Sequence, residues 1–275
     1  MANASEIPSE FSPRQRLAVF KFASCDGCQL QLLSCEDELL LIADQLDIVH
    51  FLEATSRIES GPYDIALVEG SITTPEDARR IRRVREQSKY LITIGACATA
   101  GGIQALKNWG DRDEYLRCVY AEPGYIQTLA TSTAISDHVR VDFELRGCPI
   151  NRHQLLEVIR SLLQGRRPKT PSHAVCRDCK LTGTVCIAVA SKVACLGPIT
   201  QSGCGAICPR FDRGCYGCFG PTQQANCHQL ANWYLEHGIA SHQLVPLLRN
   251  FNANAPEFRD AGDRIDPATN PGEPL

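Results

Sequence analysis

The chain has 275 residues, of which 44% are hydrophobic and 21% are charged, and its formal net charge is −3. This balance is that of a globular protein of one large domain or two, and the charge does not favour binding to nucleic acid or to an anionic membrane. The sequence contains no run of about 18 apolar residues. Its first twenty residues have neither an apolar signal core nor a twin-arginine pair. We therefore expect a cytoplasmic protein without a membrane span.

Strands and helices are predicted to alternate through the first 165 residues. Apolar runs predict strands at 17–23, 46–52, 63–70, 90–97 and 139–148. Helical spacing and capping residues predict helices at 28–43, 73–88 and 151–165. Short, nearly continuous apolar strands separated by helices are typical of a parallel sheet covered on both faces. We therefore expect an α/β fold, a doubly wound parallel sheet, in residues 1–165.

The character of the chain changes at residue 166. A basic linker with two prolines covers 166–173, and residues 176–221 show little strand or helix periodicity. One helix is predicted at 222–237, and the tail 263–275 is predicted to be an irregular extension. A segment rich in Cys, Gly and Pro cannot build an ordinary apolar core. We expect an irregular second domain, residues 166–275, held together in another way.

The fifteen cysteines indicate how that domain is held. An odd number cannot pair fully within one chain, and a disulfide framework is not expected in a reducing compartment. Clustered cysteines in a cytoplasmic protein are more typical of metal binding.

Four cysteines of the first domain are predicted to meet at one edge of the sheet. Cys25 and Cys28 follow the first predicted strand, Cys97 ends the fourth, and Cys148 ends the fifth. Ligands of open α/β sheets bind beyond the carboxyl ends of the strands. Four converging thiolates hold a [4Fe–4S] cluster or a tetrahedral zinc ion. In the alternative interpretation, Cys97 and Cys148 are buried core thiols.

Eight more cysteines lie within 43 residues of the second domain. A zinc ribbon would use only the pairs 176/179 and 215/218, whereas two [4Fe–4S] clusters use all eight thiols. The spacing therefore favours iron–sulfur clusters over zinc. Three cysteines are left over and are predicted to be small buried hydrophobic residues, namely Cys35, Cys118 and Cys227.

Glu69 lies at the end of the third predicted strand, in the stretch "VEGS". A carboxylate there can hydrogen-bond near the first cysteine set or relay protons. A purely structural or helix-capping role is the alternative. No G-x-G-x-x-G pattern follows the first strand, so NAD is not expected to bind there.

Several stretches taken together resemble the small, electron-transferring subunit of [NiFe] hydrogenases. These are "CDGCQLQLL", "VEGSI", "GACATAGG", "GCP" and "CLGPITQSGCGAICPRFDRGCYGCFGP", within residues 17–221. The resemblance is greatest to the cytosolic multimeric branch, which includes sulfhydrogenase-like, NAD(P)-linked and viologen- or F420-type enzymes. It implies a flavodoxin-like first domain and an irregular iron–sulfur second domain.

The resemblance also implies three [4Fe–4S] clusters with their ligands. The proximal cluster would be bound by Cys25, Cys28, Cys97 and Cys148. The distal cluster would be bound by Cys176, Cys179, Cys186 and Cys195. The medial cluster would be bound by Cys204, Cys208, Cys215 and Cys218. Membrane-bound relatives have a histidine at the position of Cys176, and a proline where Cys208 supplies a fourth medial thiol.

In such an enzyme the nickel–iron centre, where H2 is split or formed, lies on a large partner subunit. The present chain would relay electrons between that centre and iron–sulfur and flavin subunits linked to NAD(P). Two alternatives remain open from the sequence. One is a complex I-like subunit with a single cluster, although that family has adjacent cysteines where this chain has "CDGC". The other is a structural or regulatory protein stapled by zinc, without a redox role.

Overall fold

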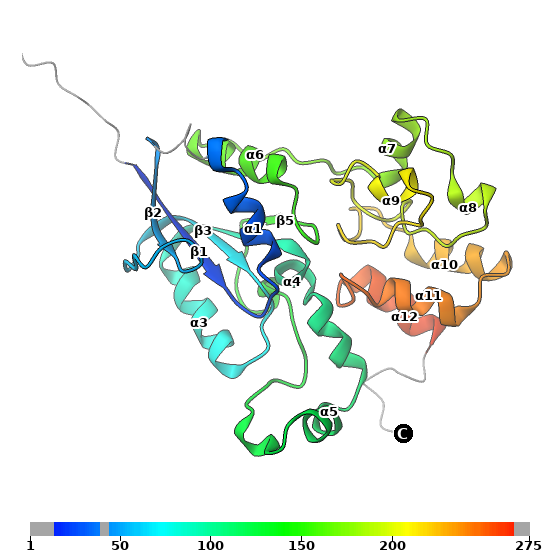
Figure 1. The fold of residues 1–275 in the computed structure, drawn as a ribbon, viewed down its shortest axis with the longest axis horizontal. Helices are drawn as coiled ribbons and strands as arrows, with labels where there is room; N and C mark the ends of the chain where they lie inside the picture. The colour runs from blue at the N-terminus through cyan, green and yellow to red at the C-terminus, as the bar shows by residue number, and fades with distance from the viewer. Residues whose placement is uncertain (1–13, 39–43, 267–275) are drawn as a thin grey trace, which may run out of the picture.

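The structure, a computed structural model, describes residues 14–38 and 44–266. Its first part contains a five-stranded, fully parallel sheet with the strand order β2-β1-β3-β4-β5 (Figure 1). This is the order of flavodoxin-like folds, so the expected α/β class is confirmed. The strands are β1 Gln15–Lys21, β2 Leu46–Phe51, β3 Tyr63–Glu69, β4 Ser88–Ile94 and β5 Phe143–Leu145.

Helices cover both faces of the sheet. Helices α1 (Gly27–Leu33) and α6 (Arg152–Leu163) pack on one face, where Leu32 and Leu155 join the core. Helix α3 (Pro75–Glu86) packs on the other face through Ile81 and Val84. It begins where expected, because Thr74 caps it and proline suits its first turn. The strands are apolar on both sides because both faces are buried.

Three expected elements end at other residues than predicted. Strand β5 has three residues rather than the ten of 139–148, and α1 ends at Leu33 rather than at residue 43. Residues 39–43 lie outside the described part. Strand β4 ends at Ile94, and helix α4 (Gly95–Ala100) follows at once. Cys97 therefore lies in a helix and not at a strand end. Gly95 permits this sharp turn because its φ of +87° is accessible to glycine.

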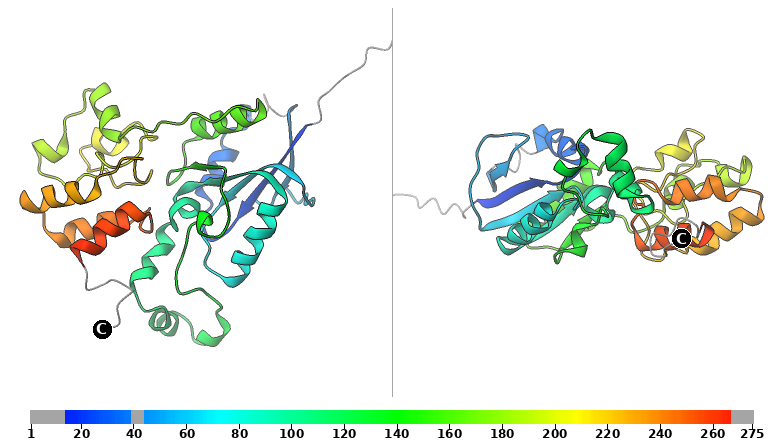
Figure 2. Two further views of the ribbon diagram at one scale, coloured as in Figure 1. Left: turned by 180° about the vertical axis from the view of Figure 1, so that it is seen from behind. Right: turned by 90° about the horizontal axis from the view of Figure 1, so that it is seen from below.

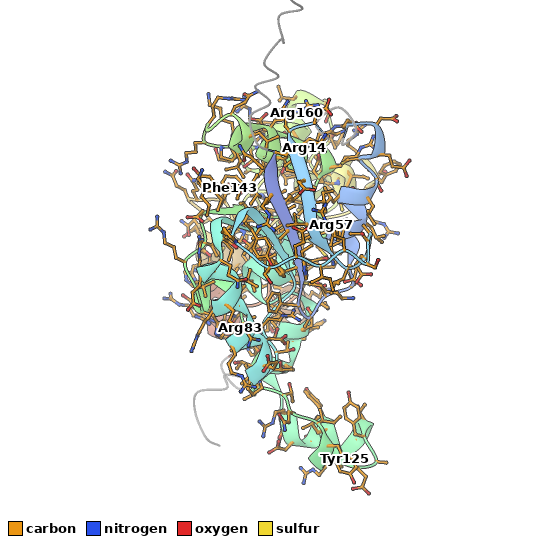
Figure 3. All side chains as sticks on the ribbon, turned by 90° about the vertical axis from the view of Figure 1, so that its left-hand side faces the viewer. Arg14, Arg57, Arg83, Tyr125, Phe143 and Arg160 are labelled. Carbon is orange, nitrogen blue, oxygen red and sulfur yellow. The ribbon has the colours of Figure 1, made fainter. Side chains whose placement is uncertain are left out.

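A projecting arm follows α4 and was not expected from the sequence. It comprises the 3₁₀ segment η1 (Ile103–Trp109), helix α5 (Arg112–Val119) and η2 (Pro123–Tyr125). None of the residues of α5 is buried, and Tyr125 at the end of the arm is 84% exposed (Figure 3). Cys118 on α5 is exposed. The expectation that it is a buried hydrophobic residue is therefore wrong, whereas Cys35 and Cys227 are buried.

The chain returns from the arm through the short 3₁₀ segment η3 (Ile135–Asp137), continues through β5 and α6, and enters the second part of the molecule (Figure 2). This part contains only helices and loops. The cysteine-rich stretch forms the short helices α7 (Val175–Leu181), α8 (Ile187–Ala190) and α9 (Ile207–Arg210). Three longer helices follow: α10 (Cys227–Glu236), α11 (Ser241–Leu248) and α12 (Pro256–Ile265). Only α10 was expected. Because α12 runs to Ile265, the tail does not become irregular at residue 263.

Helices α10–α12 share a small core with α4, in which Ala100 packs with Leu248 and Phe258. A polar cluster also joins the two parts. The indole Nε1 of Trp109 donates to Asp263 Oδ1 at 2.8 Å, and the Arg249 guanidinium lies 4.9 Å from the Trp109 ring centre. Arg249 is buried and pairs with Asp263 at 2.7 Å. Among the residues described, no helix is long and apolar enough to cross a membrane.

Candidate metal centres

The four expected cysteines of the first part gather beyond the carboxyl ends of the strands. Cys25 lies in the loop after β1, Cys28 in the first turn of α1, Cys97 in α4, and Cys148 after β5. Burial raises the pKa of Cys28, with Glu69 and the neighbouring thiols adding to it. Burial and then the Cys148 thiol raise the pKa of Cys97 to about 11. The four thiols are therefore close enough to act on one another electrostatically.

Two glycines leave the space that these thiols occupy. A Cβ on Gly95 would lie 2.4 Å from the Cys28 Sγ, and one on Gly102 would lie 2.6 Å from the Cys97 Sγ. Both glycines also have positive φ, +87° and +66°. Any larger residue would push a thiol out of the set and strain the backbone.

Glu69 and Gln104 border this proximal set. Glu69 is 2% exposed, and its Oε1 accepts a hydrogen bond from the Cys28 backbone N–H at 3.0 Å. Its Oε2 is buried and has no hydrogen-bond partner among the described residues. Burial raises the pKa of Glu69, although the Cys28 amide opposes this. Gln104 lies 3.5 Å from the Cys97 Sγ and donates to the Ala23 carbonyl at 2.8 Å.

A second set of thiols forms around α7 and α8. Burial raises the pKa of Cys176 to about 11, and the thiols of Cys195, Cys179 and Cys186 add to it in that order. Gly197 leaves room between two of them, because a Cβ there would lie 3.3 Å from the Cys195 Sγ and 3.5 Å from the Cys176 Sγ. The expected distal set is therefore brought together. Cys186 is its exposed member and Cys195 its buried one.

The third set lies between the other two. Burial raises the pKa of Cys218 to about 12, with the thiols of Cys204, Cys208 and Cys148 adding to it. Burial also raises the pKa of Cys215, next to Cys195 and Cys218. A cavity of about 530 Å³ opens beside three members of this medial set and beside Cys148. The expected medial set therefore borders the proximal set at one end and the distal set at the other.

The contact between the medial and distal sets is a hydrogen bond. The backbone N–H of Cys215 donates to the Cys195 Sγ at 3.2 Å. Tyr234 of α10 lies against the same cysteine, and its hydroxyl accepts from the Cys195 N–H at 2.9 Å and donates to the Cys195 carbonyl at 2.8 Å. Burial raises the pKa of Tyr234, so its hydroxyl keeps its proton.

Among the described residues, no group of three or more Cys, His, Asp or Glu side chains converges on a point where one ion could bind. Thiolates that share one zinc ion, each about 2.3 Å from it, lie within about 4 Å of one another. In a [4Fe–4S] cluster each thiolate binds a different iron, so the thiols stand further apart. Four thiols in each set supply the donors that a cluster of this kind requires.

The raised pKa values describe the thiols before a metal binds. Without a cation, buried thiols near one another stay protonated, because thiolates would repel and lack solvent. A bound metal supplies the opposite charge and deprotonates the thiols that coordinate it. The donor type, the space left by glycines and the grouping by four all fit a [4Fe–4S] cluster at each set.

Sequence reasoning missed two residues of these sites. Gln104 follows the glycine pair 101–102, and that proximity was an available signal. Tyr234 lies on a helix far along the chain from Cys195, and nothing in its local sequence marks it.

Comparisons with known proteins show the family of the chain. A family model described as NADH ubiquinone oxidoreductase, 20 Kd subunit, matches residues 25–162. The chain is 36% identical over 211 residues to sulfhydrogenase 2 subunit delta of Pyrococcus furiosus, in a match that covers 77% of this chain and 88% of that protein. It is 25% identical over 174 residues to the delta subunit of the NAD-reducing hydrogenase HoxS of Cupriavidus necator, with coverage of 57% and 82%.

Solved structures share the fold. A crystal structure of an NAD+-reducing [NiFe]-hydrogenase in the H2-reduced state contains a chain that superposes with a TM-score of 0.54 at 29% identity. The match covers 57% of the present chain and 96% of that one. A chain of the [NiFeSe]-hydrogenase of Dm. baculatum superposes with a TM-score of 0.52 over 77% of the present chain and 96% of its own. At 16% identity, that second match concerns the fold alone.

Proposed function

The chain belongs to the family of [NiFe] hydrogenase small subunits, and on that premise we propose that it binds three [4Fe–4S] clusters. The proximal cluster is assigned to Cys25, Cys28, Cys97 and Cys148. The medial cluster is assigned to Cys204, Cys208, Cys215 and Cys218, and the distal cluster to Cys176, Cys179, Cys186 and Cys195. When bound, such clusters accept and release one electron at a time.

The observation that carries this proposal is the row of three thiol sets. Cys148 of the first set is near Cys218 of the second, and Cys215 of the second is hydrogen-bonded to Cys195 of the third. The row starts at the sheet edge and ends at the exposed Cys186. A row with one end at the surface suits the transfer of electrons across a subunit.

We further propose the partners of this row. The nickel–iron centre, where H2 gives two protons and two electrons, belongs on a large subunit that covers the proximal set. The distal end meets an iron–sulfur or flavin subunit that passes electrons to NAD(P), in a cytoplasmic complex. The division into a sheet domain, 1–165, and a cluster domain, 166–275, belongs to the same proposal.

Glu69 is proposed to hold or move a proton beside the proximal set. Its buried position and its hydrogen bond to the Cys28 amide support this role. The unpartnered Oε2 leaves one oxygen for a proton or a water molecule. The alternative, a carboxylate that only fixes the Cys28 backbone, remains and is tested below.

The experiment that tests the proposal is metal and sulfide analysis of the complex purified with this chain. About twelve irons and twelve sulfides per copy of the chain are expected beyond those of its partners, with nickel confined to the large subunit. Cys28→Ser, Cys179→Ser and Cys215→Ser should each remove the iron of one cluster. Cys35→Ser, Cys118→Ser and Cys227→Ser are matched controls that should remove none.

Other results would contradict the proposal. About four irons per chain would favour a complex I-like subunit with one cluster. Zinc without sulfide would favour the zinc-stapled structural protein and exclude the redox role. Iron loss in a control variant would contradict the assignment of that cysteine.

A further inference from the structure

Cys195 is held at all three of its polar groups. Its backbone N–H and carbonyl both bond to the hydroxyl of Tyr234, at 2.9 and 2.8 Å. Its Sγ accepts the backbone N–H of Cys215 at 3.2 Å. Tyr234 is 2% exposed, and its ring packs edge-on against Trp233. One buried hydroxyl from α10 thus fixes the backbone that carries a distal thiol.

The backbones of segments 194–196 and 214–215 also lie next to each other. The Leu196 N–H donates to the Cys215 carbonyl at 2.9 Å. This hydrogen bond lies next to the one that the Cys215 N–H donates to the Cys195 Sγ. A Cβ on Gly214 would lie 2.0 Å from the Ala194 carbonyl oxygen. Only glycine allows this approach. The contact between the medial and distal sets is therefore a short, specific pairing of backbones.

We propose that Tyr234 is a positioning residue for electron transfer between the medial and distal clusters, which rests on the cluster assignment proposed above. By fixing both backbone groups of Cys195, it keeps the Cys195 sulfur at the Cys215 amide. Removing the hydroxyl leaves a buried N–H and a buried carbonyl without partners, so the segment shifts to satisfy them. The N–H···S bond is then weakened or lost.

This bond has two consequences for the electron path. A hydrogen bond to a ligating sulfur stabilises the electron-rich state and raises the reduction potential of that cluster. The hydrogen bond also links the two sets, because only the covalent atoms of Cys215 separate the Cys215 sulfur from the amide that donates to the Cys195 sulfur. Such a bonded route favours electron tunnelling over a gap through space. One electron leaves the medial side and enters the distal side, and no proton moves.

The test is Tyr234→Phe in the assembled complex, with Tyr216→Phe as the matched control. Tyr216 lies between two medial cysteines and is 36% exposed, so its hydroxyl does not hold a buried backbone as that of Tyr234 does. Redox titration followed by electron paramagnetic resonance measures the midpoint potential of each cluster. The distal signal is recognised as the one that Cys179→Ser, a distal ligand variant, removes.

Tyr234→Phe should keep its full iron content, lower the midpoint potential of the distal cluster and slow H2-driven reduction of an external acceptor several-fold. The proximal potential should stay the same, and Tyr216→Phe should change neither value. An unchanged distal potential in an iron-replete Tyr234→Phe complex overturns this inference alone. Absence of any distal cluster from the unmodified complex overturns the proposed function with it.

A milder variant covers the case in which Tyr234→Phe loses iron. Ring-fluorinated tyrosine at position 234 keeps the size of the side chain but makes the hydroxyl a stronger donor and a weaker acceptor. A shift confined to the distal potential supports the inference, with fluorinated tyrosine at position 216 as the control. No shift at position 234 overturns it.

Discussion

At the scale of single residues, the proximal set depends on glycine as well as on cysteine, because a side chain at certain positions would displace a thiol. Gly95 stands where β4 turns into α4, and a Cβ there would come 2.4 Å from the Cys28 sulfur. The residue must also adopt a φ of +87°. Space and backbone conformation therefore both require glycine at this position.

Gly95→Ala should abolish the proximal cluster and lower the iron content by about four atoms per chain. The added methyl group displaces the Cys28 thiol, and the positive φ adds strain of about 1 kcal/mol or more. Gly124→Ala is the control, because a Cβ there meets nothing within 4 Å. Iron analysis of both purified complexes is the measurement. A full iron content in Gly95→Ala would contradict the assigned proximal ligands.

Glu69→Gln separates the two roles open to this carboxyl group. Glutamine can still accept the Cys28 N–H, so the iron content and the proximal signal should be kept. It cannot take up and release a proton, so H2-driven dye reduction should fall about 10²-fold. Glu53→Gln, an exposed carboxyl after β2, should leave the rate unchanged. An undiminished rate in Glu69→Gln would show that the carboxyl only fixes the Cys28 backbone.

At the scale of elements, the cluster of Trp109, Arg249 and Asp263 holds η1 of the sheet part against α11 and α12. Arg249 is 8% exposed and pairs with Asp263 at 2.7 Å. Breaking a buried pair leaves an uncompensated buried charge. This cluster is thus a polar link between the two parts.

Arg249→Met should lower the free energy of unfolding by about 3 kcal/mol, since it removes the cation that pairs with the Asp263 carboxylate and the contact with the Trp109 ring. Arg83→Met breaks a pair on exposed α3, where both side chains are more than half exposed, and should cost less than about 1 kcal/mol. Thermal unfolding of the complexes compares the two variants. Equal losses of stability would contradict the role given to the buried pair.

The elements that could be predicted from sequence are those with a regular pattern. Strands β1–β4 were predicted because both faces of the sheet bury them and their residues are continuously apolar. Helix α4 was missed because "GACATA" is too short to show a period. Helix α5 buries none of its residues, and α11 contains Pro246, which ordinarily argues against a helix.

At the scale of the whole molecule, charge is distributed unevenly. The chain has 28 Lys and Arg residues and 31 Asp and Glu residues. In residues 166–218, however, there are eight Lys and Arg residues, and the acidic residues are only Asp178 and Asp212. Leu181, Val185 and Val189 in the same stretch are 71–75% exposed, on either side of the exposed Cys186. Three of these cations, Arg177, Lys180 and Lys192, are exposed in the stretch of the distal cysteines, and an acidic face on the partner subunit would complement them.

In a complex of this chain with the large subunit, Lys180→Glu combined with Lys192→Glu should lower the rate constant for H2-driven reduction of the separately added iron–sulfur or flavin subunit about tenfold at low salt. Reduction of a small uncharged dye should stay the same, because the clusters are not altered. Arg79→Glu on α3, an exposed cation of the sheet part, is the control. The rate should also fall with ionic strength in the unmodified complex. A rate insensitive to both changes would contradict an acidic partner.

The fold class and the family follow from the sequence alone. Continuous apolar strands can only lie in a covered parallel sheet, and the carboxyl ends of parallel strands meet at one edge whatever the loops do. Only the tertiary structure decided how the sets touch and what supports them. Residues distant in sequence meet in the hydrogen bond from the Cys215 N–H to the Cys195 sulfur, in the hydrogen bonds of the Tyr234 hydroxyl, and in the ion pair of Arg249 with Asp263. Such contacts depend on three-dimensional packing, and no local pattern encodes them.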